Sequence, residues 1–372
     1  MIRRALLVLG LVLATARVAE AYPQFQLDGS QACVDCHVAP AGGGLLTDFG
    51  RLFAEDLSAD DGDESFLGGR WTPPDWLAMS GDVRLAVGAS GRGDYGPAIA
   101  PVFIPMQAEV NASANVGAGF SLAATTGLRG GLGAGNVLSL FQVREHYVMW
   151  RPSDDGRGVY ARAGRYMAPY GLRLAEHPAY TRRYAGTNLF SETYGVSVGY
   201  VGAAGEVHAT GFVHDVLRDP VEPGDGAALL VEARLGGQVA LGASGRTATS
   251  DLEARHQAGV HAKVFLPSVH TLVQGEVYGI RQTFEVGPDR DQVAGYLMGS
   301  HRRGAWMYSL AVGHYDEDVD VGGLDRDAVD ANVHWFPWAH WEFVVTARTQ
   351  LLGWGDGGPT SGYGLVQAHY RL

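Results

Sequence analysis

The stretch Trp341-Glu342-Phe343-Val344-Val345-Thr346-Ala347-Arg348 decides the fold. Apolar and polar side chains take alternate places in it, with Trp341, Phe343 and Val345 on one side and Glu342, Thr346 and Arg348 on the other. The segment 253–266 repeats the pattern, with Arg255, Gln257, His261 and Lys263 opposing Ala258, Val260, Ala262 and Val264. A period of two is typical of a β-strand whose two faces meet different surroundings. Both segments therefore predict long amphipathic strands.

Strands of this kind are expected from residue 77 to the end of the chain. The sixteen candidates are 77–90, 101–116, 117–128, 138–150, 157–167, 193–203, 205–214, 226–236, 237–247, 253–266, 269–283, 291–302, 303–315, 325–336, 339–351 and 361–372. Tight turns such as 236–237 alternate with longer connections such as 168–192, which is the asymmetry between periplasmic turns and extracellular loops in outer-membrane barrels. An even strand count places both barrel ends in the periplasm.

Composition supports a barrel of this class. The chain has 53 glycines, 16 tyrosines and 8 tryptophans, and its mean hydropathy is −0.03. We expect an all-β fold: an antiparallel outer-membrane β-barrel of about 16 strands, with one face of each strand against lipid. Trp335, Phe336, Trp338 and Trp341 cluster about one turn, as an interfacial aromatic girdle does. A soluble β-sandwich would also alternate, but it would not need the girdle.

The N-terminus has the pattern of a secretory signal. Arg3 and Arg4 precede the apolar run 5–14, and Ala19-Glu20-Ala21 gives a cleavage pattern, so residues 1–21 are expected to be removed. The mature chain then divides into a segment 22–57, an acidic linker 58–74 and the barrel 75–372. These features predict the outer membrane of a Gram-negative bacterium as its location. The net charge of −12 argues against nucleic-acid binding.

The segment 22–57 contains Cys33-Val34-Asp35-Cys36-His37, which has the C-x-x-C-H attachment pattern of one covalent haem c. The Cys33 and Cys36 thiols would form thioethers to the haem, and His37 would be the proximal iron ligand. These are the only cysteines of the chain. A disulfide is the alternative in an exported protein. A thioredoxin-like redox pair would need a βαβ pattern that the sequence lacks.

The surroundings of the haem must come partly from the barrel, because so short a segment cannot enclose the ring. We expect the segment in the periplasmic mouth or the lumen. Leu46, Phe49 and Phe53 share one side of a predicted helix and would cover an apolar haem face; alternatively, they pack against the barrel rim. No His or Met lies between His37 and Met79, which is expected to face lipid.

The distal iron ligand is therefore expected from the barrel. Three histidines lie on the polar side of their strands near predicted periplasmic ends, and we rank His369 first, followed by His334 and His208. The alternative for each is a simple polar lining of the lumen.

The N-terminal region resembles the fused monohaem cytochrome–porin family of outer-membrane iron oxidisers. The resemblance rests on Tyr22-Pro23-Gln24-Phe25, on Cys33-x-x-Cys36-His37 and on Leu46-Thr47-Asp48-Phe49-Gly50-Arg51-Leu52-Phe53. It implies a haem segment ahead of a sixteen-stranded barrel, with Cys33, Cys36 and His37 holding the haem. It further implies electron transfer from an extracellular donor, such as Fe(II), to periplasmic electron carriers. The insertion 42–44 departs from the family pattern.

Two rival functions stay open. One is an outer-membrane porin or transporter whose haem is structural or sensory, and the other is a barrel without haem. The linker 58–64 is either a solvated loop or a docking patch for a carrier, and the acidic run 316–320 is either solvated or a cation site. The loop 170–178 with Arg182-Arg183 is expected to fold inward and to constrict the pore or bind anions. The sequence shows no hydrolase or transferase site.

Overall fold

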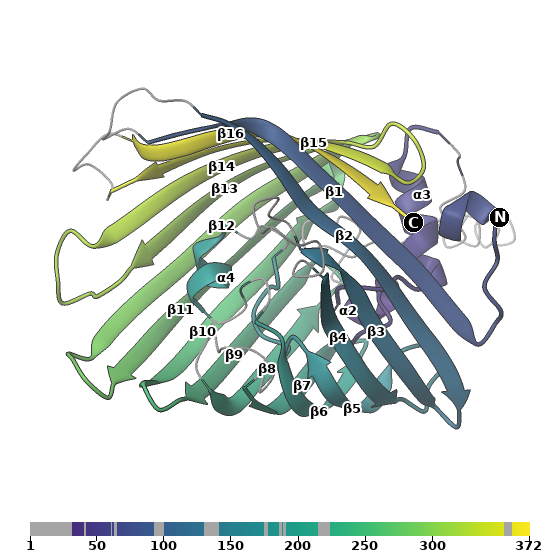
Figure 1. The fold of residues 1–372 in the computed structure, drawn as a ribbon, viewed down its shortest axis with the longest axis horizontal. Helices are drawn as coiled ribbons and strands as arrows, with labels where there is room; N and C mark the ends of the chain where they lie inside the picture. Colours follow the sequence, from purple (N-terminus) through teal and green to yellow (C-terminus); the bar gives the residue numbers. More distant parts are fainter. Residues whose placement is uncertain are drawn as a thin grey trace, which may run out of the picture.

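Sixteen antiparallel strands form a closed barrel in this computed structural model (Figure 1). The structure describes residues 32–40, 42–60, 62, 65–92, 100–129, 141–174, 178–185, 188, 191–214, 224–352 and 359–372. The strands are β1 (Leu77–Arg92), β2 (Ala100–Gly117), β3 (Phe120–Arg129), β4 (Phe141–Trp150), β5 (Gly158–Tyr166), β6 (Thr193–Gly202), β7 (Gly205–Val213), β8 (Asp225–Leu235), β9 (Val239–Thr249), β10 (Glu253–Leu266), β11 (Thr271–Phe284), β12 (Arg290–Arg303), β13 (Trp306–Asp316), β14 (Asp325–Trp335), β15 (Trp341–Leu351) and β16 (Pro359–Arg371). The predicted barrel and its strand count are confirmed.

The barrel closes through its first and last strands. β1 pairs with β16 over eleven residues, with Val83 opposite Tyr370. The backbone of Leu372 then forms two hydrogen bonds with Gly81, of 2.7 and 3.1 Å. Each remaining strand pairs with its neighbours in the chain. Every edge is therefore paired, as a barrel in lipid requires.

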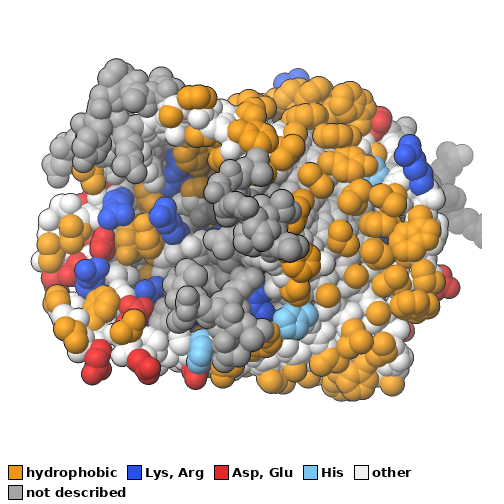
Figure 2. Space-filling view, viewed as in Figure 1, with side chains coloured by type: hydrophobic (Ala, Val, Ile, Leu, Met, Phe, Trp, Pro, Cys, Tyr) orange, Lys and Arg blue, Asp and Glu red, His pale blue; other side chains and the backbone are white. Residues whose placement is uncertain are grey.

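The two faces of the wall differ as the alternation predicts. On β7, Val207 and Val213 are exposed outward, whereas Glu206, His208 and Thr210 are buried toward the lumen. Apolar side chains cover much of the outer face in Figure 2, and charged ones gather at the left of that view.

One residue of the predicted girdle does not belong to it. Trp335, Trp338 and Trp341 are exposed, but Phe336 is only 1% exposed. Phe336 follows Trp335, and successive side chains of a strand point to opposite faces. It therefore points inward, where it packs on the N-terminal segment.

Two segments occupy the interior of the barrel. The connection between β5 and β6 folds inward, as predicted, and its helix α4 (Tyr180–Tyr184) packs on β11, β12 and β13 (Figure 1). Tyr170 stacks on Tyr278 of the wall, with ring centroids 5.0 Å apart.

The second interior segment comes from the N-terminus. Helices α2 (Cys33–Cys36) and α3 (Asp48–Leu57) lie at the end of the barrel where the short turns and the C-terminus are found (Figure 1). The 3₁₀ helices η2 (Phe66–Gly69) and η5 (Pro267–Val269) lie in the linker and in the β10–β11 turn. Among the helices that the structure describes, none is long and apolar enough to cross a membrane.

Candidate functional site

The Cys33–His37 segment has a defined local structure. α2 ends at His37, whose extended backbone forms an antiparallel bridge to Leu46. Thr47 N donates to Cys36 O (2.8 Å), and Thr47 Oγ1 donates to Asp35 O (2.7 Å). Thr47 also caps α3, because its side-chain oxygen accepts from Gly50 N (3.1 Å). One threonine thus fixes α2 and α3 relative to each other.

Gly50 allows the close approach of the two helices. A Cβ at this position would lie 2.4 Å from Cys36 O. No other residue type fits this place without moving the C-x-x-C turn.

The two thiols and the imidazole lie near one another. Cys33 and Cys36 are not joined in a disulfide, Cys36 has no exposed surface and His37 is 5% exposed. A Cβ on Gly42 would lie 3.5 Å from Cys33 Sγ and from His37 Cδ2. Gly42 has φ +76°, which favours glycine, so it leaves space between these two side chains.

The thiol of Cys33 is poorly suited to redox exchange. Burial raises the pKa of this thiol to about 11, with Glu206 as a further cause. The thiolate is the reactive form of cysteine, so a raised pKa suppresses disulfide chemistry. The site is therefore better suited to a stable covalent attachment than to reversible disulfide exchange.

The barrel wall binds α2 through polar contacts. Arg157, in the β4–β5 turn, pairs with Asp35 (2.9 Å). Arg151 Nη1 in the same turn donates to Val38 O (3.2 Å). These contacts and the α3 contacts below place the segment inside the barrel mouth on the side of the short turns.

α3 is anchored by a hydrophobic cluster. Phe53 (2% exposed) and Leu57 (1%) pack with four wall residues: Phe265, Leu272, Met307 and Phe336. Asp56 pairs with Arg302 (3.2 Å). The contacts of Phe53 favour the rim-packing alternative for this residue. Leu46 is not on the predicted helix, because α3 begins at Asp48 and Leu46 is bridged to His37, while Phe49 is half-buried and is not part of the cluster.

Two of the predicted distal ligands have other partners. His369 Nδ1 bonds Glu342 (2.8 Å) and its Nε2 bonds Asp82 (2.7 Å). His334 Nδ1 bonds the other oxygen of Glu342 (2.7 Å). Both ring nitrogens of His369 are thus hydrogen-bonded to carboxylates. This does not favour His369 as the first candidate for the distal iron ligand.

His208 lies in better surroundings. Its Nδ1 bonds Tyr160 Oη (2.7 Å), and its Nε2 is 3.3 Å from Glu206 Oε1. Glu206 is also one of the charged groups that act on Cys33. His208 therefore belongs to a part of the wall whose charge acts on Cys33, although Tyr160 and Glu206 are partners of its two ring nitrogens.

Sequence reasoning missed two further candidates. His261 on β10 is 4% exposed and bonds Glu232 (3.2 Å), a second charged neighbour of Cys33. Met149 on β4 is 2% exposed and lies in a cluster against which Val38 packs. Strand alternation places His261 on the lumen side with Gln257 and Lys263, so the pattern contained its signal. Met149 faces the lumen only because β4 changes parity at an irregularity opposite Thr125 and Thr126, which the sequence pattern does not reveal.

The predicted cation site and the predicted docking patch have weaker support. In the acidic run 316–320, Glu317 pairs with Arg290 (2.7 Å) and Arg326 (2.9 Å), and these two cations neutralise part of the charge of the run. Within the described ranges, no cluster of three or more metal-ligating side chains occurs. In the linker, Asp60 accepts a hydrogen bond from Ala339 N (2.9 Å).

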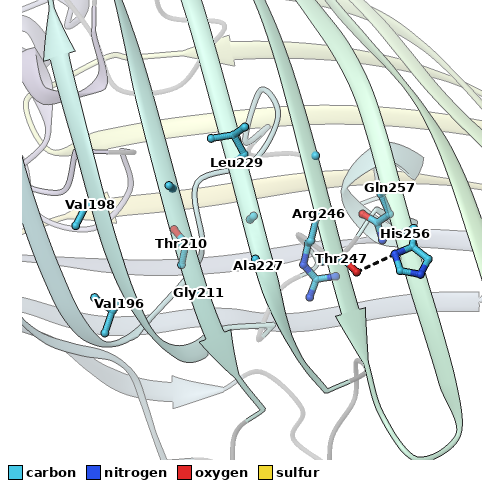
Figure 3. Close-up of a pocket in the computed structure, with 13 residues that line it drawn as sticks. Val196, Val198, Thr210, Gly211, Ala227, Leu229, Arg246, Thr247, His256 and Gln257 are labelled. Carbon is cyan, nitrogen blue, oxygen red and sulfur yellow. Dashed lines mark hydrogen bonds between the residues drawn. The ribbon is translucent and has the colours of Figure 1, made fainter.

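A groove of about 720 Å³ lies elsewhere, on the outer wall across β6–β10 (Figure 3). Its exposed lining includes Val196, Val198 and Leu229. Thr247 Oγ1 and His256 Nδ1 are hydrogen-bonded at its margin (2.8 Å). This groove is separate from the cysteine segment.

No protein-family profile matches the chain, and no curated protein is similar in sequence. Solved structures share the fold. OmpT of Vibrio cholerae is 12% identical, with a TM-score of 0.60, over 81% of this chain and 99% of that one. The anion-selective porin of Comamonas acidovorans is 13% identical (TM-score 0.59; 80% and 99%). OmpF of Salmonella typhi, solved with daunomycin, is 11% identical (TM-score 0.61; 80% and 97%).

Proposed function

We propose that this porin-fold barrel lies in an outer membrane, holds one covalent haem c in its periplasmic mouth, and passes electrons between the cell exterior and periplasmic carriers. The porins above are matched over nearly their whole length, yet about a fifth of this chain has no counterpart in them. The chain ahead of β1 has about this length. We therefore assign the specific function to the segment ahead of β1.

One observation carries the proposal: the C-x-x-C-H segment is held inside the barrel mouth, and its two cysteines are not joined in a disulfide. The donor set of two thiols and one adjacent imidazole is the set that c-type haem needs. Gly42 leaves open the space between Cys33 and His37. Cys33, Cys36 and His37 therefore suit the attachment of a haem c.

Each part of the segment would have a distinct task. Cys33 and Cys36 would hold the haem covalently, and His37 would bind its iron. The haem supplies one-electron redox chemistry, with its potential set by axial ligands and burial. α3 and the wall would limit the access of water, and His208, His261 or Met149 would supply the distal side. The extracellular donor would be Fe(II) or another reductant that meets the outer end of the barrel.

A diffusion porin is the second candidate. It is favoured by the solved structures that share the fold, which are porins and channels. The packing of α3 and α4 on the inner wall does not separate the two candidates, because segments that line a barrel narrow its pore without closing it. A porin would conduct ions without needing Cys33, Cys36 or His37.

The test is a visible spectrum of the membrane-extracted protein, oxidised and reduced, made in a host with c-type haem maturation. We expect a covalent haem spectrum that the Cys33→Ala/Cys36→Ala variant lacks, and a spectrum altered by His37→Ala. Reduction of the haem by Fe(II) would then identify the donor. Absence of haem from the wild type, together with ion conductance in bilayers, would leave the porin candidate.

A further inference from the structure

Two arginines of the interior converge on the cysteine segment. Arg173, in the inward-folded connection, donates from Nη1 to Gly42 O (3.0 Å). A Cβ on Gly43 would lie 3.4 Å from its Nη2. Arg173 has φ +53°, a left-handed conformation that non-glycine residues rarely adopt. The backbone is thus held in an unfavourable form at the residue that reaches the segment, and such strain is concentrated at functional sites.

Arg162 approaches from the wall. It lies on β5 with 3% of its surface exposed. Its guanidinium is 3.7 Å from the ring centroid of Tyr166 and 5.1 Å from that of Tyr147. Val38, the residue after His37, packs on the cluster that these tyrosines form. The cation is therefore adjacent to the segment that follows the imidazole.

The hydrogen-bonding capacity of Arg162 is incompletely used. Its Nε and Nη2 are buried and have no hydrogen-bond partner within the described part of the chain. Neighbouring interior arginines are paired: Arg144 with Glu109 (3.0 Å) and Arg165 with Glu192 (3.7 Å). A buried guanidinium without an anion is costly, so this position calls for an acceptor.

Arg173 is the second cation near the segment. Burial is the main cause that lowers the pKa of its guanidinium, and the nearby charge of Arg162 adds to it. Glu145 is the carboxylate that acts on Arg173, and it is half-buried. Arg173 also acts on Cys33, where its charge opposes that of Glu206 and Glu232.

We propose that Arg162 and Arg173 bind the two propionate carboxylates of the haem attached at Cys33 and Cys36. This inference rests on the proposed function. Haem has two peripheral carboxylates, and arginine binds carboxylates through two parallel, charge-assisted hydrogen bonds. The tyrosine rings hold Arg162 in a fixed place, and the strained backbone holds Arg173. Arg162 gains an acceptor for its Nε and Nη2, and Arg173 gains a charged acceptor in addition to the carbonyl of Gly42.

The charges also predict an effect on the redox equilibrium. Oxidation adds a positive charge at the iron, and nearby cations oppose that charge more strongly in a buried site than in water. Arg162 and Arg173 therefore favour the ferrous state and raise the potential. Loss of either cation should favour the ferric state.

The experiment compares Arg162→Gln and Arg173→Gln with Arg162→Lys and Arg173→Lys in the membrane-extracted protein. Arg281→Gln is the matched control, because it removes an arginine from the opposite end of the barrel, where Arg281 pairs with Asp289 and Asp291. Haem staining after denaturing electrophoresis reports attachment. An optical redox titration gives the midpoint potential, and resonance Raman bands of the propionates report their hydrogen bonds.

We expect each Gln variant to keep its haem, to shift the propionate bands and to shift the ferric–ferrous equilibrium about tenfold toward ferric, which is about 59 mV for one electron. The Lys variants should shift less and the control not at all. Wild-type potentials and bands in both Gln variants would overturn the assignment. If a Gln variant loses its haem, the Lys variants decide: shifted bands support the assignment and wild-type bands overturn it. A wild type without haem would overturn the proposed function as well, which distinguishes the two failures.

Discussion

Removing the Phe53 side chain should release α3 from the barrel mouth. Phe53 is 2% exposed and packs among wall residues that include Phe265 and Phe336. The guanidinium of Arg302 also lies 5.7 Å from its ring centroid. Phe53→Ala deletes the ring and leaves Leu57 as the one residue of α3 in this cluster.

The size of the effect follows from the burial. Replacing a buried phenylalanine by alanine costs about 3–5 kcal/mol. Each 1.4 kcal/mol is about tenfold in an equilibrium constant, so the ratio of docked to undocked α3 should fall by about a hundredfold or more. The barrel itself should stay folded, because its strand pairing does not involve Phe53.

Hydrogen exchange followed by mass spectrometry measures this ratio directly. Amides of 48–57 should exchange about a hundredfold faster in Phe53→Ala, while amides of β10 and β14 keep their protection. Leu52→Ala is the control, because Leu52 lies on the same helix with 63% of its surface exposed. Equal exchange of 48–57 in Phe53→Ala and in the wild type would refute the docking described for α3.

Three further predictions concern the interior segments. Gly50→Ala places a methyl group against Cys36 O, so exchange of amides 33–37 should increase and haem attachment should decrease; wild-type exchange would contradict the close packing of α2 and α3. Tyr180→Ala removes a ring that is 1% exposed and joins α4 to the wall, so single-channel conductance should rise, and an unchanged conductance would count against α4 as a constriction. In haem-free protein at pH 8, the Cys33 thiol should be alkylated about a hundredfold more slowly than an ordinary thiol, because raising its pKa from 9.0 to about 11 lowers the thiolate fraction. Mass spectrometry of the folded and urea-unfolded chains measures this ratio, and equal rates would contradict the burial of Cys33.

The strands were predictable because their signal is local. Alternation at a period of two is visible within any ten residues, and the turns lie where the alternation stops. The same information places His261 on the lumen side, but not Met149, whose strand changes parity at an irregularity. It does not show which lumen-facing residues meet, because that depends on the order and stagger of strands around the barrel.

The site was only partly predictable for the same reason. The C-x-x-C-H motif is contiguous, so Cys33, Cys36 and His37 could be identified directly. The bond from His369 to Asp82 spans 287 positions of the chain and exists because the last strand pairs with the first. Likewise, Arg162 and Arg173 meet the segment only after it enters the barrel.

The complete burial of Cys36 sets an order of events during biogenesis. In the finished barrel this thiol has no exposed surface, and Gly50 and Thr47 cover its backbone. A maturation enzyme that joins any group to Cys36 must therefore act while the N-terminal segment is still outside the barrel. The time between export of the segment and the docking of α2 and α3 in the barrel mouth is thus the interval in which Cys36 can be modified.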